Sequence, residues 1–201
     1  MGHNTILRGA AAALLALALT GCLGLGGGKP PATLFSLTAS QSAPAGSIAS
    51  GKPASDALMV MEPEADRRLA VQRIPVQVSA SSVAYLQDAL WVERPARLFR
   101  SLLAETLRAR GGRLVLEDDQ AVPLVAERLS GRLLDLGYDA RSQSVVVRFD
   151  AFRSDAKGVL ASKRFESTVP GVSARPEAIG PALNKAANDV AGQVADWVKG
   201  G

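Results

Sequence analysis

The chain has 201 residues, of which 47% are hydrophobic and 21% charged, and its formal net charge is +4 at neutral pH. That length suffices for one domain with a substantial core. A single cysteine, Cys22, and a single histidine, His3, exclude an internal disulfide and a zinc site built on Cys and His. Basic and acidic residues are interleaved, with no run of five or six like charges, so we expect no nucleic-acid partner.

Residues 1–21 have the pattern of a secretory signal peptide. Arg8 precedes an apolar run from Gly9 to Leu19, which is too short to span a bilayer as a helix. The run leads into Leu19-Thr20-Gly21-Cys22, which resembles a bacterial lipobox. This resemblance implies cleavage between Gly21 and Cys22, followed by attachment of a diacylglyceryl thioether and an N-acyl chain such as palmitate to Cys22. The alternative is an ordinary secretory signal with a chance cysteine.

Two or more acyl chains anchor a protein stably, so a lipidated Cys22 would hold the chain on a membrane without a transmembrane helix. Leu23 follows, where an Asp would favour the inner membrane in similar lipoproteins. We therefore expect the periplasmic face of the outer membrane of a Gram-negative bacterium. Cleavage would also remove His3, which excludes a Ser-His-Asp triad, and we expect neither an enzyme nor a cofactor beyond the lipid. Residues 22–33 read as a Gly/Pro-rich tether.

Residues 34–201 are expected to form one domain. A first strand is predicted at 33–37, and the Ser-, Ala-, Pro- and Gly-rich residues 38–56 are predicted to be a flexible loop. Further strands are predicted at 57–61 and 74–78. Two short apolar runs, 83–86 and 89–92, are interpreted as a hairpin with Gln87-Asp88 as its turn.

A helix is predicted to begin at Arg94-Pro95, because apolar residues then recur every three or four positions and Gly111 is a natural C-cap. A short strand at 114–116 and a solvated turn containing Asp118-Asp119 follow. Residues 124–138 fit a helix by spacing, but Gly131 and Gly137 weaken that interpretation. The hairpin that follows needs a neighbouring strand, so a strand is predicted over about 127–138.

Residues 145–151 alternate as a strand, 154–158 have turn chemistry, and 159–169 are the returning strand. A second amphipathic helix is predicted over about 176–198. The expected fold class is α+β: a mixed or antiparallel sheet of about five to seven strands with two main helices packed on one face.

Several of these features, in this order, resemble the ABC-type transport auxiliary lipoproteins. They are the lipobox, Leu34-Phe35-Ser36-Leu37 after the tether, the segment Arg73-Ile74-Pro75-Val76, Tyr85-Leu86 and Trp91-Val92-Glu93-Arg94-Pro95. Phe35 stands where such proteins often have Tyr, and the loop before Ala57 is long. The resemblance covers nearly all of the chain after the signal peptide.

The resemblance implies a non-catalytic accessory role beside transporters with mammalian-cell-entry (MCE) domains, which move lipids or other hydrophobic molecules between the two membranes. An MCE-domain protein is the implied partner, and some members form rings, so a homo-oligomeric ring is one expected assembly. Two alternatives stay open: a lipoprotein that regulates a cell-envelope enzyme, and a lipoprotein that itself carries a lipid in an apolar cavity.

Four residues are candidates for a partner interface, and no residue is a candidate metal ligand. Tyr85 and Trp91 are of types enriched at interfaces, although core packing is the alternative for both. Glu93 and Arg94 at the start of the first helix are either a partner contact or a solvated pair.

Overall fold

The computed structural model describes residues 33–47, 56–118, 125, 127–155, 157–158 and 160–200. The predicted signal peptide, Cys22 and nearly all of the predicted tether lie outside these residues. The described part is α+β, as predicted, with two α-helices and one mixed sheet.

Nine strands form the sheet, four of them with two or three residues. They are β1 (Thr33–Phe35), β2 (Leu58–Val60), β3 (Glu64–Ala65), β4 (Arg73–Gln77), β5 (Val83–Trp91), β6 (Val115–Glu117), β7 (Glu127–Asp139), β8 (Ser144–Asp155) and β9 (Leu160–Val169). The helices are α2 (Pro95–Arg110), α3 (Pro176–Gly200) and the short 3₁₀ helix η3 (Arg67–Leu69).

The long strand β7 organises the sheet. One of its edges pairs along its whole length with antiparallel β8, which pairs in turn with β9. Its other edge pairs with three short parallel strands in succession, β2, β3 and β4. β5 lies antiparallel to β4, β1 lies parallel to β5, and β6 lies parallel to β2. The sheet is therefore mixed.

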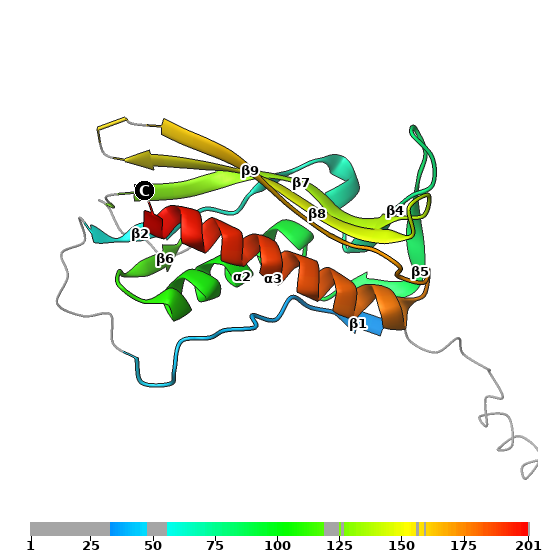
Figure 1. Ribbon diagram of the computed structural model, residues 1–201, viewed down its shortest axis with the longest axis horizontal. Coiled ribbons are helices and arrows are strands. Elements are labelled where there is room, and N and C mark those ends of the chain that lie inside the picture. The colour runs from blue at the N-terminus through cyan, green and yellow to red at the C-terminus, as the bar shows by residue number, and fades with distance from the viewer. Residues whose placement is uncertain are drawn as a thin grey trace, which may run out of the picture. The chain divides into compact units, whose positions relative to one another are not determined.

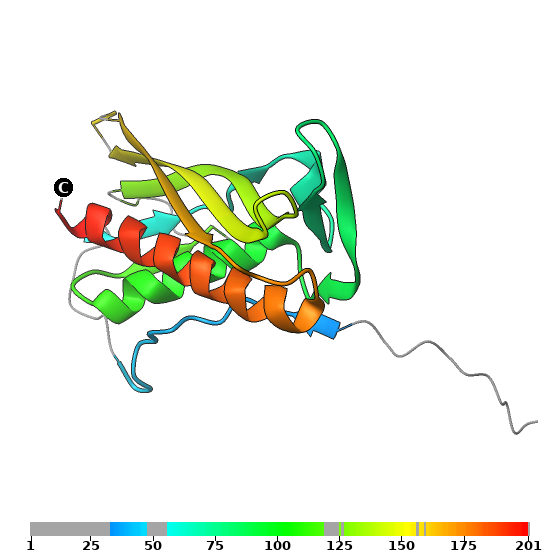
Figure 2. The ribbon, with the colours of Figure 1, turned by 45° about the vertical axis from the view of Figure 1, so that its right-hand side comes forward.

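Both helices cover the same face of the sheet (Figures 1 and 2). α3 crosses β8 and β9, and α2 packs beside α3 and over β6. α2 begins at Pro95, and Gly111 follows its last residue with φ of 67°, as the capping pattern predicts. The core fills the space between these layers and contains the apolar stripes of both helices and the inward side chains of β7 and β8.

The preference for a strand over 127–138 is confirmed, and its glycines explain why. A Cβ at Gly131 would lie 2.2 Å from the carbonyl oxygen of Asp150 and 2.5 Å from the Phe149 ring. A Cβ at Gly137 would lie 2.5 Å from the carbonyl oxygen of Pro75. Both glycines therefore let neighbouring strands and an aromatic ring approach β7 closely, a role that glycine has in strands.

The predicted hairpin at Gln87-Asp88 is wrong. Residues 83–91 form one strand, and the chain reverses earlier, between β4 and β5, where Val78 and Ser79 donate backbone hydrogen bonds to the Ser82 carbonyl. The register between β4 and β5 shifts from Arg73 opposite Leu90 to Pro75 opposite Tyr85, and Asp88 has φ of 57°. The turn-like residues thus form a bulge within a strand rather than a turn between strands.

Part of the predicted loop 38–56 is anchored to the helices. The amide of Thr38 donates to Asn184 Oδ1 at 2.8 Å, and that of Ser40 donates to Asn188 Oδ1 at 2.7 Å. The amide of Ala43 donates to Glu105 Oε1 of α2 at 2.8 Å. Residues 38–43 therefore lie along α3 and reach α2, and residues 48–55 lie outside the described residues.

Candidate functional site

The predicted interface residues do not form one surface. Trp91 is 2% exposed, and its ring packs edge-on against Phe35 with 6.2 Å between centroids. Phe35 lies against α3, since a Cβ at Gly180 would come within 2.8 Å of its ring. Trp91 is therefore a core residue that holds β1 and β5 against α3, as the packing alternative predicted. Its indole Nε1 is buried and has no hydrogen-bond partner among the described residues.

Tyr85 lies on the opposite face of the sheet from Trp91. It pairs with Pro75, and the Arg73 guanidinium stacks over its ring at 4.5 Å from the centroid. Its hydroxyl donates a long 3.5 Å bond to the Arg68 carbonyl. Because the bulge at Asp88 inserts extra residues between Tyr85 and Trp91, sequence spacing alone could not place them relative to each other.

Glu93 and Arg94 lie at the surface at the start of α2. Glu93 pairs with Arg97 at 3.0 Å, and Arg94 pairs with Glu62 at 3.4 Å. The side chains of Arg94 and Arg97 are 60% and 50% exposed. Exposed ion pairs of this kind contribute little to stability, so a partner could replace them at little cost. Glu93 and Arg94 are therefore accessible to a partner.

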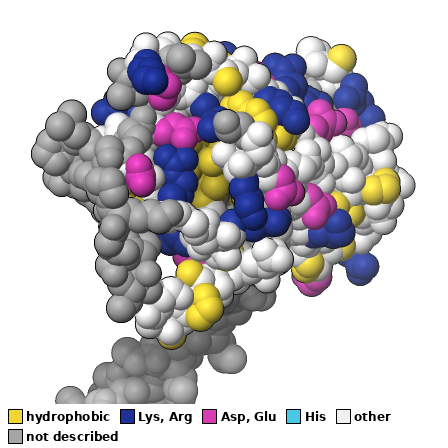
Figure 3. Space-filling view, turned by 60° about the vertical axis from the view of Figure 1, so that its left-hand side comes forward, with side chains coloured by type: hydrophobic (Ala, Val, Ile, Leu, Met, Phe, Trp, Pro, Cys, Tyr) yellow, Lys and Arg dark blue, Asp and Glu magenta, His cyan; other side chains and the backbone are white. Residues whose placement is uncertain are grey.

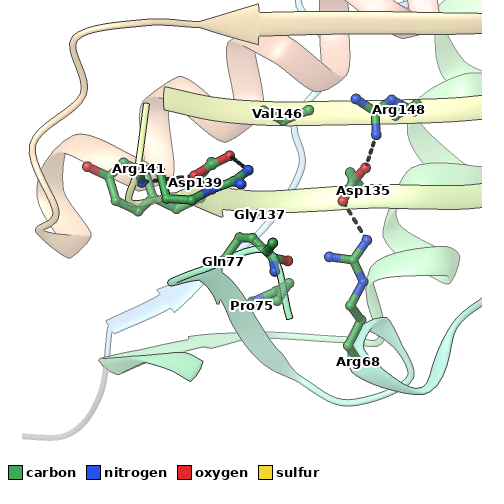
Figure 4. A pocket seen from close by; sticks show the side chains of 11 residues that line it. Arg68, Pro75, Gln77, Asp135, Gly137, Asp139, Arg141, Val146 and Arg148 are labelled. Carbon is green, nitrogen blue, oxygen red and sulfur yellow. Dashed lines mark hydrogen bonds and ion pairs between the residues drawn. The ribbon is translucent and has the colours of Figure 1, made fainter. Parts of the chain in front are cut away.

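The face of the sheet away from the helices carries a pocket of about 390 Å³ (Figure 4). Asp135, Gly137 and Asp139 of β7 point to this face, because they alternate with the buried Leu136 and Tyr138. The rest of the lining comes from η3, β4, the turn after β4, the end of β7, the turn after β7 and β8: Arg68, Pro75, Gln77, Ala80, Tyr138, Arg141, Val146 and Arg148.

Asp135 lies between two arginines in this pocket, as Figure 4 shows. Its Oδ1 accepts from Arg68 Nη2 at 2.5 Å and its Oδ2 accepts from Arg148 Nη1 at 2.6 Å. Arg148 also donates to Glu166 of β9 at 2.6 Å. The hydrogen bond that Arg148 donates to Glu166 raises the pKa of the Arg148 guanidinium.

A second ion pair closes one side of the pocket. The guanidinium of Arg141 donates to both carboxylate oxygens of Asp139, at 3.0 and 2.7 Å, and the Arg141 amide adds a bond of 2.9 Å. The hydrogen bonds from the Arg141 side chain lower the pKa of Asp139 to about 2. Cross-strand pairing continues beyond the pocket, where Arg164 holds the pKa of Asp150 below its usual value.

A largely buried ion cluster, which the sequence pattern does not predict, lies where α2 meets the end of β6. Arg100 is 5% exposed; its Nη1 bonds Asp118 Oδ1 and its Nε lies 3.2 Å from Glu117 Oε2. Asp118 Oδ2 also accepts the Glu62 amide at 2.7 Å, so the prediction that Asp118 is a solvated turn residue is wrong. The spacing of Arg100 places it largely away from the apolar stripe of the helix, and this spacing gives no sign of the carboxylates that it meets in the fold.

The described residues contain no group of three or more His, Cys, Asp or Glu side chains arranged to hold a metal ion. Neither helix in the described part of the chain has the length and hydrophobicity that crossing a bilayer requires. On the face that Figure 3 shows, Lys and Arg side chains are interspersed with Asp and Glu, with hydrophobic side chains between them.

Comparison with known proteins places this fold. Residues 35–195 match the model of a family described as ABC-type transport auxiliary lipoprotein component. Comparison with curated proteins gives no match.

Two of the solved structures that resemble this chain show the same fold. One, of an uncharacterised protein, is 13% identical with a TM-score of 0.66 and covers 84% of this chain and 99% of its own. A protein from Xanthomonas campestris is 15% identical with a TM-score of 0.63 and covers 84% and 92%. A PelC dodecamer from Paraburkholderia phytofirmans, 17% identical and covering 74% and 92%, has a TM-score of only 0.42, too low to support an inference.

Proposed function

Because the chain belongs to the family of ABC-type transport auxiliary lipoprotein components, we propose that it is a non-catalytic accessory protein of an MCE-type transporter. Membership implies a membrane-associated protein of the cell envelope. In this proposal the transporter moves lipids or other hydrophobic molecules between the inner and outer membranes. The observation that carries it is the family match, which spans β1 to α3 and thus nearly every described element.

The anchor is the second part of the proposal. Cleavage after Gly21 would leave Cys22 to carry a diacylglyceryl group and an N-acyl chain, on the periplasmic face of the outer membrane. The lipobox at Leu19-Thr20-Gly21-Cys22 supports it, because Cys22 is the only cysteine in the chain and occupies the one position where this processing needs it. Mass spectrometry of the mature protein tests it: the expected N-terminal peptide begins at an acylated Cys22.

Two places are proposed for the partner contact: the exposed start of α2, where Glu93 and Arg94 offer charged groups, and the outer face of the sheet, where the half-buried Tyr85 offers an aromatic group. Interfaces use groups of these types for specificity. Trp91 is not part of the proposed contact, because it is buried.

A homo-oligomeric ring stays a prediction, and the native mass of the lipidated protein checks it.

Photo-crosslinking in intact cells tests the partner. A photoreactive residue at position 94 or 85 should capture an MCE-domain protein, identified by mass spectrometry of the adduct. The matched control is position 164, an exposed arginine on β9. Capture of wall enzymes without any MCE protein would replace the transport role with regulation of an envelope enzyme.

A pocket favours a second candidate, a lipid carrier. A space of about 430 Å³ lies between the β5 bulge and the start of α3, with apolar walls that include Val76, Leu86 and Pro176. Pockets of this size hold small apolar ligands. If the protein is a carrier, lipid will copurify with it and native mass spectrometry will show the adduct. A Leu86→Trp substitution should then abolish it.

A further inference from the structure

Three large apolar side chains are exposed where the described chain enters the domain. Leu34 is 62% exposed, Leu90 is 36% exposed and Val92 is 43% exposed. Leu34 pairs directly with Leu90 across β1 and β5, and the amide of Val92 bonds the carbonyl of Phe35 at 2.9 Å. We call these three residues the apolar strip.

The strip faces away from the helices. Side chains alternate between the faces of a strand, and Phe35 and Trp91, the next register pair, point toward α3 and pack together. Leu34 and Leu90 therefore lie on the opposite, open face. Figures 1 and 2 show β1 at the point where the described chain begins, beside β5 and the first turns of α3.

We infer that the apolar strip rests against the lipid bilayer, an inference that depends on the proposed anchor at Cys22. Thr33 follows Cys22 by eleven residues, so even a fully extended chain separates them by no more than about 38 Å. The strip begins one residue later, at Leu34. A surface held this close to a membrane contacts it at a high effective concentration, so three side chains suffice where a free protein would need a larger apolar surface.

The groups around the strip make this contact apolar rather than electrostatic. Arg94 pairs with Glu62 and Arg97 pairs with Glu93 at the nearby start of α2. Arg73, opposite Leu90 on β4, is exposed, and its guanidinium stacks over the ring of Tyr85. Because two of these three arginines are paired with glutamates, the contact should persist at high salt, unlike attraction of a basic surface to anionic headgroups.

Nitroxide labels on the full-length lipidated protein test the inference. The anchor occupies the native thiol, so Leu90→Cys and Val92→Cys each supply one labelling site. Leu160→Cys is the matched control, because Leu160 is 67% exposed but lies on β9 at the other edge of the sheet. The proteins are placed in vesicles of phosphatidylethanolamine and phosphatidylglycerol, and electron paramagnetic resonance measures collisions with oxygen and with a water-soluble nickel complex.

The expected result is a severalfold lower nickel accessibility and a higher oxygen accessibility at positions 90 and 92 than at 160. These differences should be the same in about 0.5 M salt, which screens surface charges. If the protein floats with the vesicles but all three labels are equally accessible to the nickel complex, the apolar strip does not touch lipid, and the anchor proposal survives. Failure to float overturns the anchor itself. Shielding that appears only after a partner protein is added would make the strip a protein contact and overturn the inference.

Discussion

At the scale of single residues, one glycine and one aspartate show how β7 is specified. Gly131 makes room for the Phe149 ring, which also packs edge-on against Phe99 of α2 at 5.1 Å between centroids. The contact between Phe149 and Phe99 joins the sheet to the helical layer, and it depends on the space that Gly131 leaves for the Phe149 ring. Asp139, at the end of the same strand, is held by Arg141.

A Gly131→Ala substitution should destabilise the fold, because the new Cβ would meet the Asp150 carbonyl and the Phe149 ring, and the backbone atom cannot move without shifting β8. We expect a loss of about 2 kcal/mol or more in the free energy of unfolding, measured by urea denaturation. Gly192→Ala in α3 is the control: its Cβ would meet only Arg110 Nη2 at 3.8 Å. It should be neutral or gain up to about 1 kcal/mol from helix propensity. Equal stability of the Gly131 variant and the wild type would contradict this account of β7.

Acid should weaken the Asp139–Arg141 pair in a defined pH range. The pKa of Asp139 is lowered from 3.8 to about 2 in the folded state, so its contribution to stability is complete above pH 4 and is lost as the pH falls through 2. The difference in stability between wild type and Asp139→Asn should therefore shrink between pH 4 and 2. Chemical denaturation across this range measures it, and a difference that does not change with pH would show that the ion pair is absent in solution.

At the scale of elements, α3 does more than cover the sheet. Its Asn188 accepts from the amide of Ser40 and donates to the carbonyl of Thr38 at 2.9 Å, so one side chain pairs with two backbone groups of the segment after β1. The helical pattern marked this side of α3 as polar and solvated. It gave no sign that another part of the chain binds there, because a surface asparagine and an asparagine that holds backbone look alike in sequence.

An Asn188→Ala substitution should release this segment selectively. Amide exchange at Ser40 is expected to rise at least severalfold, whereas the free energy of unfolding falls by only about 1 kcal/mol. Asn184→Ala should instead expose the amide of Thr38. Lys185→Ala, which removes only a surface pair with Asp189, is the control. Hydrogen exchange followed by NMR separates the three, and protection of Ser40 that survives in Asn188→Ala would show that the segment is held by other contacts.

At the scale of the whole molecule, the sequence pattern predicted the elements better than their connections. Amphipathic spacing, Pro95 and Gly111 located α2, and the alternation in 145–151 located β8. Parallel pairing of β2, β3 and β4 along β7 could not be predicted, because it depends on contacts between residues more than sixty positions apart. The outer-face pocket was missed for the same reason: its charged groups come from β7, β8 and the η3 segment, each with an ordinary surface pattern.

The described domain should unfold as one unit, because one continuous core joins the sheet to both helices. The two tryptophans of the chain test this, since Trp91 packs near the start of α3 and Trp197 lies near its end, against Phe165. Single-tryptophan variants, Trp91→Phe and Trp197→Phe, should each show fluorescence and circular dichroism transitions with a common midpoint. Separate midpoints within either variant would reveal that one end of the domain melts first.

The parallel pairing of β1 with β5 has a mechanical consequence. Tension reaching the domain through residue 33 and directed along β1 loads its hydrogen bonds in shear, all together, rather than peeling them open one at a time. The Phe35 ring also packs against Gly180, so β1 cannot slide along β5 without breaking the contact between this ring and α3. The short first strand is thereby suited to bear load, and the domain would resist a pull from that end more strongly than three residues of pairing would indicate.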